Sequence, residues 1–179
     1  WLVDGYANSS LWPDFTGLLD NQQNYSSYPT ANASVTVAAT GLADGWYYMY
    51  STDVAGNISA RSTNYVMVDA TLPTVTQLTA TSGRYKASSN VDISVTFSEN
   101  VVVTLTPQIL LNLGAGHYAN YLSGSGTSTL IFRYVVLSNT NTLDLDYAST
   151  TALASGTIKD AYANSAVLTL PATGSANSL

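Results

Sequence analysis

The sequence predicts an all-β protein, and three observations support this prediction. Apolar and polar residues alternate in several short runs, most regularly over residues 91–97, whereas helical periodicity is absent. Only 9% of the residues are charged, while Thr, Ser, Asn, Tyr and Val are abundant, which favours half-buried strands over helices. Clusters of Gly, Ser and Asn separate the runs, and short strands at this spacing indicate a β-sandwich or a β-barrel.

The second half of the chain contains the clearest strand pattern. Val91, Ile93, Val95 and Phe97 share one face of a strand that breaks at Ser98-Glu-Asn100, where another run begins. Pro73 cannot donate to a β-ladder, so we expect a fresh strand to begin at Val75. The other predicted strands are 101–113 (one or two strands around Pro107), 117–122, 127–136 and 166–170.

The first seventy residues repeat the pattern, with strands predicted at 34–38, 46–50 and 63–68 and long loops with one short strand over 4–33. Residues 69–73 look like an interdomain linker, which divides the chain into domains 1–70 and 71–179. An Asp-x-x-x-Asn motif recurs at residues 53–57 and 160–164, about one sandwich domain apart. Counted back from its motif, the first domain lacks its opening strands. Either the chain begins within a domain, or a strand of a neighbouring chain completes it.

Charge and cysteine content exclude several function classes. The net charge is −6 and the five Lys and Arg residues are dispersed, which argues against nucleic acid and against anionic membranes as partners. The absence of cysteine excludes disulfides and thiolate metal sites. No apolar run has the length of a membrane span and no signal peptide opens the chain, which starts at Trp1 without Met. We therefore expect a processed protein or a fragment of a longer one.

Five segments of the sequence form a recognisable set, at residues 68–75, 95–101, 143–147, 156–164 and 168–174. They resemble bacterial immunoglobulin-like repeats of large surface proteins, adhesins and cell-surface motility proteins. Residues 42–47 and 53–57 resemble a related immunoglobulin-like type. The resemblance implies two tandem Ig-like β-sandwich modules with a non-enzymatic, extracellular role at the bacterial cell surface, as a stalk or filament building block. Neighbouring modules or copies of the chain would be its partners. Ala163 stands where the repeat usually has Gly.

The acidic residues gather in the predicted turns, and Glu99 is the only glutamate among eleven acids. In an Ig-like topology, Asp69, Glu99, Asp160 and Asn164 converge at the pole that faces the linker. Asp144 and Asp146, two residues apart on a strand, fit the opposite pole. Oxygen ligands of this kind suit Ca²⁺, which would stiffen the junction. The alternative is that Asp and Asn simply favour turns.

An aromatic run at residues 46–50 suggests a second kind of site. Tyr47 resembles the tyrosine corner of Ig-like folds, and Met49 would join it in the core. Period two then sends Trp46, Tyr48 and Tyr50 to the other face, where they could bind polysaccharide or a cell-surface glycan. The alternative is that the chain's own loops cover them. Catalysis has little support, because His117 is the only histidine and no catalytic arrangement stands out.

Overall fold

The computed structural model describes residues 2–4, 41–50 and 57–179, and the regular structure in these segments is β, without any helix. The chain divides into two compact units, Trp1–Thr71 and Leu72–Leu179. The division falls one residue after the boundary predicted from the linker. The predicted strand at 34–38 lies outside the described residues.

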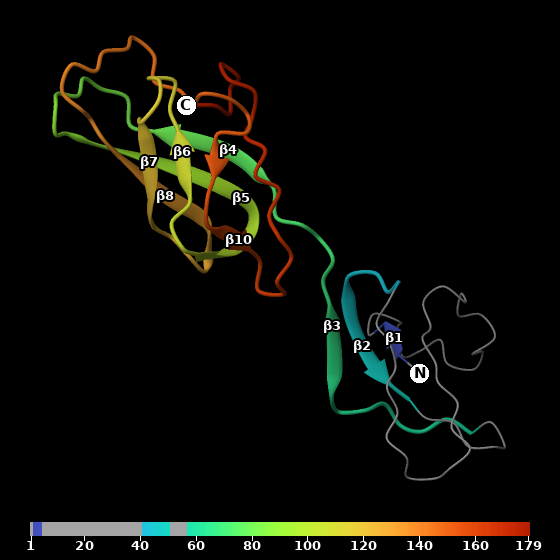
Figure 1. The fold of residues 1–179 in the computed structure, drawn as a ribbon. Coiled ribbons are helices and arrows are strands. Elements are labelled where there is room, and N and C mark those ends of the chain that lie inside the picture. The colour runs from blue at the N-terminus through green and yellow to red at the C-terminus, as the bar shows by residue number, and fades with distance from the viewer. Residues whose placement is uncertain (1, 5–40, 51–56) are drawn as a thin grey trace. The chain divides into compact units, whose positions relative to one another are not determined.

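The first unit contains a three-stranded antiparallel sheet in the order β1-β2-β3. Its strands are β1 (Leu2–Asp4), β2 (Gly45–Met49) and β3 (Tyr65–Val68), which Figure 1 shows in blue, cyan and green. Tyr47 pairs with Val66 and is fully buried, and with Leu42 and the half-buried Val68 it forms a small apolar cluster. The strand pair β2–β3 thus has one side that faces the interior of this unit.

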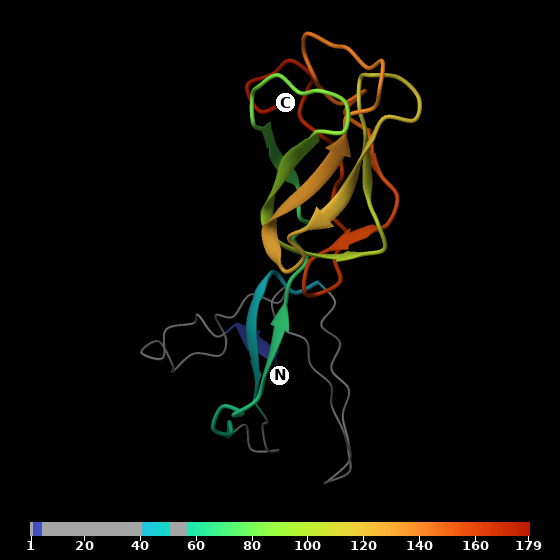
Figure 2. The same ribbon diagram turned by 90° about the vertical axis from the view of Figure 1, so that its left-hand side faces the viewer.

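The second unit is built around a larger antiparallel sheet in the order β10-β5-β8-β7-β6-β9, with β4 also paired to β5. Figures 1 and 2 show the long strands β5 and β8 side by side at the centre of this unit. Buried side chains from all seven strands form one apolar core, to which Tyr147 before β9 and Leu170 after β10 also belong. The strands are β4 (Val75–Ala80), β5 (Asn90–Thr104), β6 (Gln108–Leu110), β7 (Tyr118–Ser123), β8 (Thr127–Val135), β9 (Leu153–Ala154) and β10 (Thr157–Lys159).

Strand β5 confirms the alternation read from the sequence and corrects its predicted end. Val91, Ile93, Val95 and Phe97 are all buried in the core. The predicted break at residues 98–100 is wrong, because β5 continues through them to Thr104. The pairing with β8 shifts register between Thr96 and Val101. A bulge therefore interrupts the ladder while the strand itself remains extended, and Glu99 lies inside this irregular stretch.

The predicted strand at 166–170 does not form a ladder. Ala166 donates its N–H to Ile158 O at 2.9 Å, whereas Val167 donates to Pro73 O at 2.8 Å. The segment thus turns from one neighbour to another, and the result is isolated bridges instead of a strand. It nevertheless contributes Leu170 to the buried core.

The first and the last residues of the second unit lie near opposite ends of β4. At the start of β4, Thr74 exchanges hydrogen bonds with Ser98, since Ser98 N–H donates to Thr74 O at 2.8 Å and Thr74 N–H to Ser98 Oγ at 3.0 Å. At the far end of β4, Leu179 lies beside the loop that follows Ala80. In the described segments, no helix has the length and apolarity that crossing a membrane requires.

Candidate metal centre and aromatic face

Asp160 follows β10 directly and closes a short loop. Its side chain is only 4% exposed. Oδ1 accepts the N–H groups of Tyr162 at 2.8 Å and Asn164 at 2.9 Å, and Oδ2 accepts the Asn164 side-chain amide at 2.7 Å. Ala163 adopts a φ of 73°, so the tight turn forms even though this position has Ala and not the Gly that is usual in the repeats the sequence resembles. At residues 160–164 the Asp-x-x-x-Asn motif is therefore a loop closed by its own first and last residues, whereas residues 53–56 of the other copy lie outside the described residues.

Glu99 and Asp160, both in the second unit, bring carboxylate oxygens within 4.8 Å of each other. Glu99 is half-buried and Asp160 is buried. Two carboxylates at this separation repel each other, more strongly where solvent is partly excluded. Each carboxylate oxygen has two lone pairs, so Asp160 can hold its loop and still offer a lone pair to a cation. Of the predicted metal ligands in the second unit, this pair and Asn164 are brought together.

Asp69 belongs to the first unit, where its Oδ1 accepts the N–H of Thr71 at 3.1 Å. A neighbouring carboxylate, Asp44, was not among the ligands predicted from the sequence. Its Oδ1 accepts Ala70 N–H at 2.6 Å and its Oδ2 accepts the Thr71 hydroxyl. These hydrogen bonds lower the pKa of Asp44 below its ordinary value, and the bond from the Thr71 hydroxyl has the largest effect. An Asp-Gly step just before a strand was the available signal, since Asp in that position readily accepts backbone N–H groups.

Asp144 and Asp146 do not project from one side of a strand, so that prediction is wrong. Residues 143–146 form bends and irregular backbone. Asp146 is buried, and its two oxygens accept the N–H groups of Tyr147 at 2.8 Å and Gly174 at 3.2 Å. Asp144 is exposed and lines a surface cavity. Asp146 thus fastens the chain segment near Gly174 to the sheet, and the two carboxylates do not act as a pair.

The strand β2 separates its aromatic residues as the alternation predicts. Tyr47 is fully buried, and its hydroxyl donates to Ala43 O at 2.9 Å, as a tyrosine corner would. Trp46 is 37% exposed. Its ring centroid lies 4.4 Å from that of Tyr65, whose ring also meets that of Tyr48 at 6.0 Å. We call Trp46, Tyr48 and Tyr65 the aromatic face of the first unit.

Two predictions about this run need correction or extension. Met49 does not join the core and is 46% exposed. It is the last residue of β2 and lies beyond the pairing with β3, which ends at Tyr48, so that strand does not cover it. Tyr50 follows the strand and is half-buried. Tyr65, 53% exposed, completes the aromatic face instead, and the cross-strand register that places it opposite Tyr48 could not be read from the sequence.

Arg61 adds a cation to the aromatic face. Its guanidinium carbon lies 4.1 Å from the centroid of the Tyr48 ring, a cation–π geometry. The face therefore combines rings in edge-to-face contact with one positive charge.

Comparisons with protein-family models, with curated proteins and with solved structures find no match to this chain.

Proposed function

We propose that the chain is a non-enzymatic, extracellular pair of Ig-like β-sandwich modules from a bacterial surface protein, with a structural and adhesive role in a stalk or filament. The observation that carries the proposal is the path of the chain through the second unit. Leu72–Thr74 and Leu179 lie toward opposite ends of β4. A unit whose first and last residues lie at opposite poles has a geometry that suits modules arranged in series, as a spacer requires. Neighbouring modules, or further copies of this chain, are the partners that such a role implies.

A bound Ca²⁺ would stiffen this spacer. Glu99 and Asp160 supply hard oxygen ligands at the end of the unit where the chain enters, because Ser98, next to Glu99, is hydrogen-bonded to Thr74. Asn164 is already bonded to Asp160 and can add its amide oxygen. Asp69 belongs to the first unit and stays a predicted further ligand on the sequence argument alone.

Thermal unfolding in Ca²⁺ and in EDTA tests the metal site. Binding to the folded state alone adds about 2.7 kcal/mol when free calcium is about a hundredfold above Kd, which raises Tm by several degrees. Glu99→Gln keeps the size of the side chain and removes its charge, so the calcium-dependent rise should disappear. Asp144→Asn, an exposed acid outside this pair, should leave the rise intact. Superimposable melting curves of the unmodified protein in Ca²⁺ and in EDTA would refute the site.

The aromatic face supports a second function, polysaccharide binding by an accessory module. The specific observation is that Trp46 and Tyr65 are adjacent and exposed, while Arg61 stacks on Tyr48. Sugar rings pack their apolar faces on such surfaces. A glycan array should then show binding that Trp46→Ala and Tyr65→Ala abolish and Met49→Ala, a matched change at an exposed residue outside the face, preserves. Equal binding by all three variants would leave the aromatic face without this role.

A further inference from the structure

The second unit has a cavity of about 680 Å³ at the end of β4 that is remote from Leu72–Thr74. Two loops form most of its wall: residues 81–85, which connect β4 to β5, and residues 140–145, which follow β8. Neither loop belongs to the candidate metal centre or to the aromatic face. Sites for small ligands commonly have volumes of about 300–1,000 Å³, so a monosaccharide unit fits within this space.

The cavity has an apolar base and a polar rim. Val91 and Tyr134 are buried beneath it, and the Tyr134 hydroxyl is already occupied by a 2.7 Å hydrogen bond with His117 Nδ1. The rim carries hydroxyl and amide groups on Ser82, Thr140 and Asn141. An apolar base with a few convergent polar groups is the general composition of a small-molecule site.

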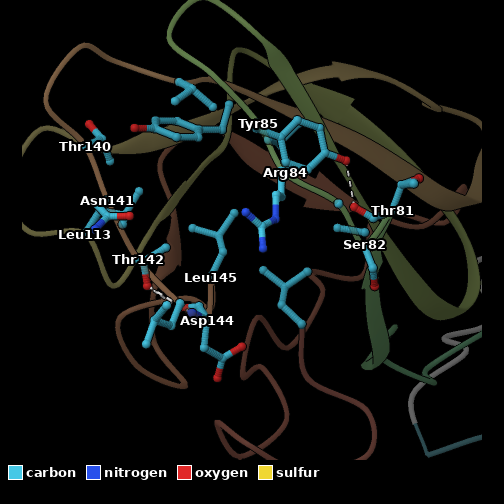
Figure 3. Close-up of a pocket in the computed structure, with 17 residues that line it drawn as sticks. Thr81, Ser82, Arg84, Tyr85, Leu113, Thr140, Asn141, Thr142, Asp144 and Leu145 are labelled. Atoms are coloured by element: carbon cyan, nitrogen blue, oxygen red, sulfur yellow. Dashed lines mark hydrogen bonds between the residues drawn. The ribbon is translucent and has the colours of Figure 1, made fainter.

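Arg84 is the distinctive residue of this cavity. Figure 3 shows its guanidinium extending into the space between the two loops. It forms no ion pair or hydrogen bond with other described residues, whereas Arg133 is held by Asp92 through bonds of 2.6 and 2.7 Å. The Asp144 carboxylate lies apart from the guanidinium in Figure 3 and makes no ion pair with it. An arginine fork directed into a cavity and unpaired there suits a carboxylate, which it can bind with two parallel hydrogen bonds.

Tyr85 stands beside Arg84 as a fixed aromatic wall. Its hydroxyl donates to Thr81 O at 2.7 Å, a bond drawn in Figure 3. A Cβ placed on Gly83 would lie 3.7 Å from the Tyr85 ring, so the ring packs closely over that glycine. The ring remains 39% exposed. A rigid, partly exposed ring next to hydroxyl and amide groups favours a sugar over an extended acidic peptide, because it offers a stacking surface for the apolar face of a pyranose.

We propose that this cavity binds an acidic monosaccharide unit, such as a hexuronic acid in a glycan. Arg84 binds the carboxylate, Tyr85 stacks on the sugar ring, and the side chains of Ser82 and Asn141 bond to hydroxyl groups. The site goes beyond the structural role proposed above and does not depend on calcium. It would give the second unit an adhesive function of its own, separate from the aromatic face of the first unit.

An NMR titration with two matched sugars tests the proposal. Methyl glucuronide carries a carboxylate where methyl glucoside carries a hydroxymethyl group. We expect the glucuronide to shift amide signals in residues 81–85 and 140–145 and to bind at least tenfold more tightly than the glucoside. Arg84→Gln should weaken the glucuronide at least tenfold, whereas Lys86→Gln, which removes a nearby charge that does not line the cavity, should not.

Several outcomes would overturn the proposal. Equal affinity for the two sugars would show that the guanidinium does not read the carboxylate, and equal losses in Arg84→Gln and Lys86→Gln would indicate general charge attraction only. Shifts confined to the aromatic face would move sugar binding to the first unit. Tighter binding of a short acidic peptide than of the glucuronide would assign the cavity to a peptide instead. Because calcium-dependent melting is measured separately, failure here leaves the metal prediction standing.

Discussion

Removing the hydroxyl of Tyr147 should lower the stability of the second unit, because this hydroxyl holds the chain segment at Pro171. Tyr147 is 1% exposed, and its hydroxyl donates to Pro171 O at 2.6 Å. Tyr147→Phe keeps the ring in the core but leaves the Pro171 carbonyl without this donor, a loss of about 1–2 kcal/mol. With a urea m-value of about 1–1.5 kcal/mol per M for a unit of this size, the midpoint should fall by about 1 M.

The same substitution should change the response to alkaline pH. Burial, and then the adjacent Asp146 carboxylate, raise the pKa of Tyr147 above its ordinary value of 10.0. A raised pKa means that the buried neutral phenol stabilises the fold below pH 10, and that this contribution is lost as the pH rises through the folded-state pKa. The gap in stability between the unmodified protein and Tyr147→Phe should therefore be full at pH 7 and narrow above pH 10.

Urea unfolding followed by far-UV circular dichroism at pH 7 and pH 10.5 measures both effects. All three tryptophans, Trp1, Trp12 and Trp46, belong to the first unit. The urea midpoint read from their fluorescence is therefore an internal control, and it should be the same in Tyr147→Phe and in the unmodified protein. If the midpoints coincide at pH 7, the hydroxyl contributes nothing and the reasoning is wrong. A gap that stays constant up to pH 10.5 and beyond would instead refute the titration argument.

Three further substitutions test the folds of the two units. Gly124→Ala places a Cβ 2.2 Å from Thr129 O and should cost about 3 kcal/mol or more in a denaturant titration, whereas Gly126→Ala, which meets no atom within 4 Å, should cost about 1 kcal/mol. Ala163→Gly relieves a φ of 73° and should raise the stability of the second unit by about 0.5 kcal/mol, while Ala161→Gly lowers it by a similar amount. Tyr47→Ala should lower the stability of the first unit, read by tryptophan fluorescence, by about 3–5 kcal/mol; an equal loss in Trp46→Ala would contradict the face assignment.

Strand positions in the second unit were predictable because one buried face imposes period two. The odd-numbered apolar residues from Val91 to Phe97 are all buried, as that pattern requires. The fate of residues 166–170 was not predictable in the same way. Their alternation is sound, but Ala166 and Val167 bond to different neighbours, and only the tertiary path decides that. The local sequence pattern predicts which side of a strand a residue faces, whereas the pairing of that strand depends on residues far away in the sequence.

The aromatic face shows the same division. Alternation assigned Tyr47 inward and Trp46 outward, and both assignments are confirmed by their exposure. Tyr65 could be added only from the register of β3 against β2, because a shift of one residue would send its ring to the other side. The cavity beside Arg84 was not anticipated at all. Its two loops are separated by more than fifty residues, and no sequence pattern brings them together.

The carboxylates divide in a way that makes Glu99 the decisive residue for calcium. Asp44, Asp146 and Asp160 all accept backbone N–H groups close to a turn or loop, which is the ordinary structural use of aspartate. Asp160 therefore has a structural reason to be where it is, with or without an ion. Turn formation does not account for Glu99, because glutamate is not a turn former and this residue lies inside the extended strand β5, with its carboxylate near that of Asp160. A calcium response that survives Asp160→Asn but disappears in Glu99→Gln would place the ion on the glutamate, and a response unchanged in both variants would show that neither carboxylate holds the ion.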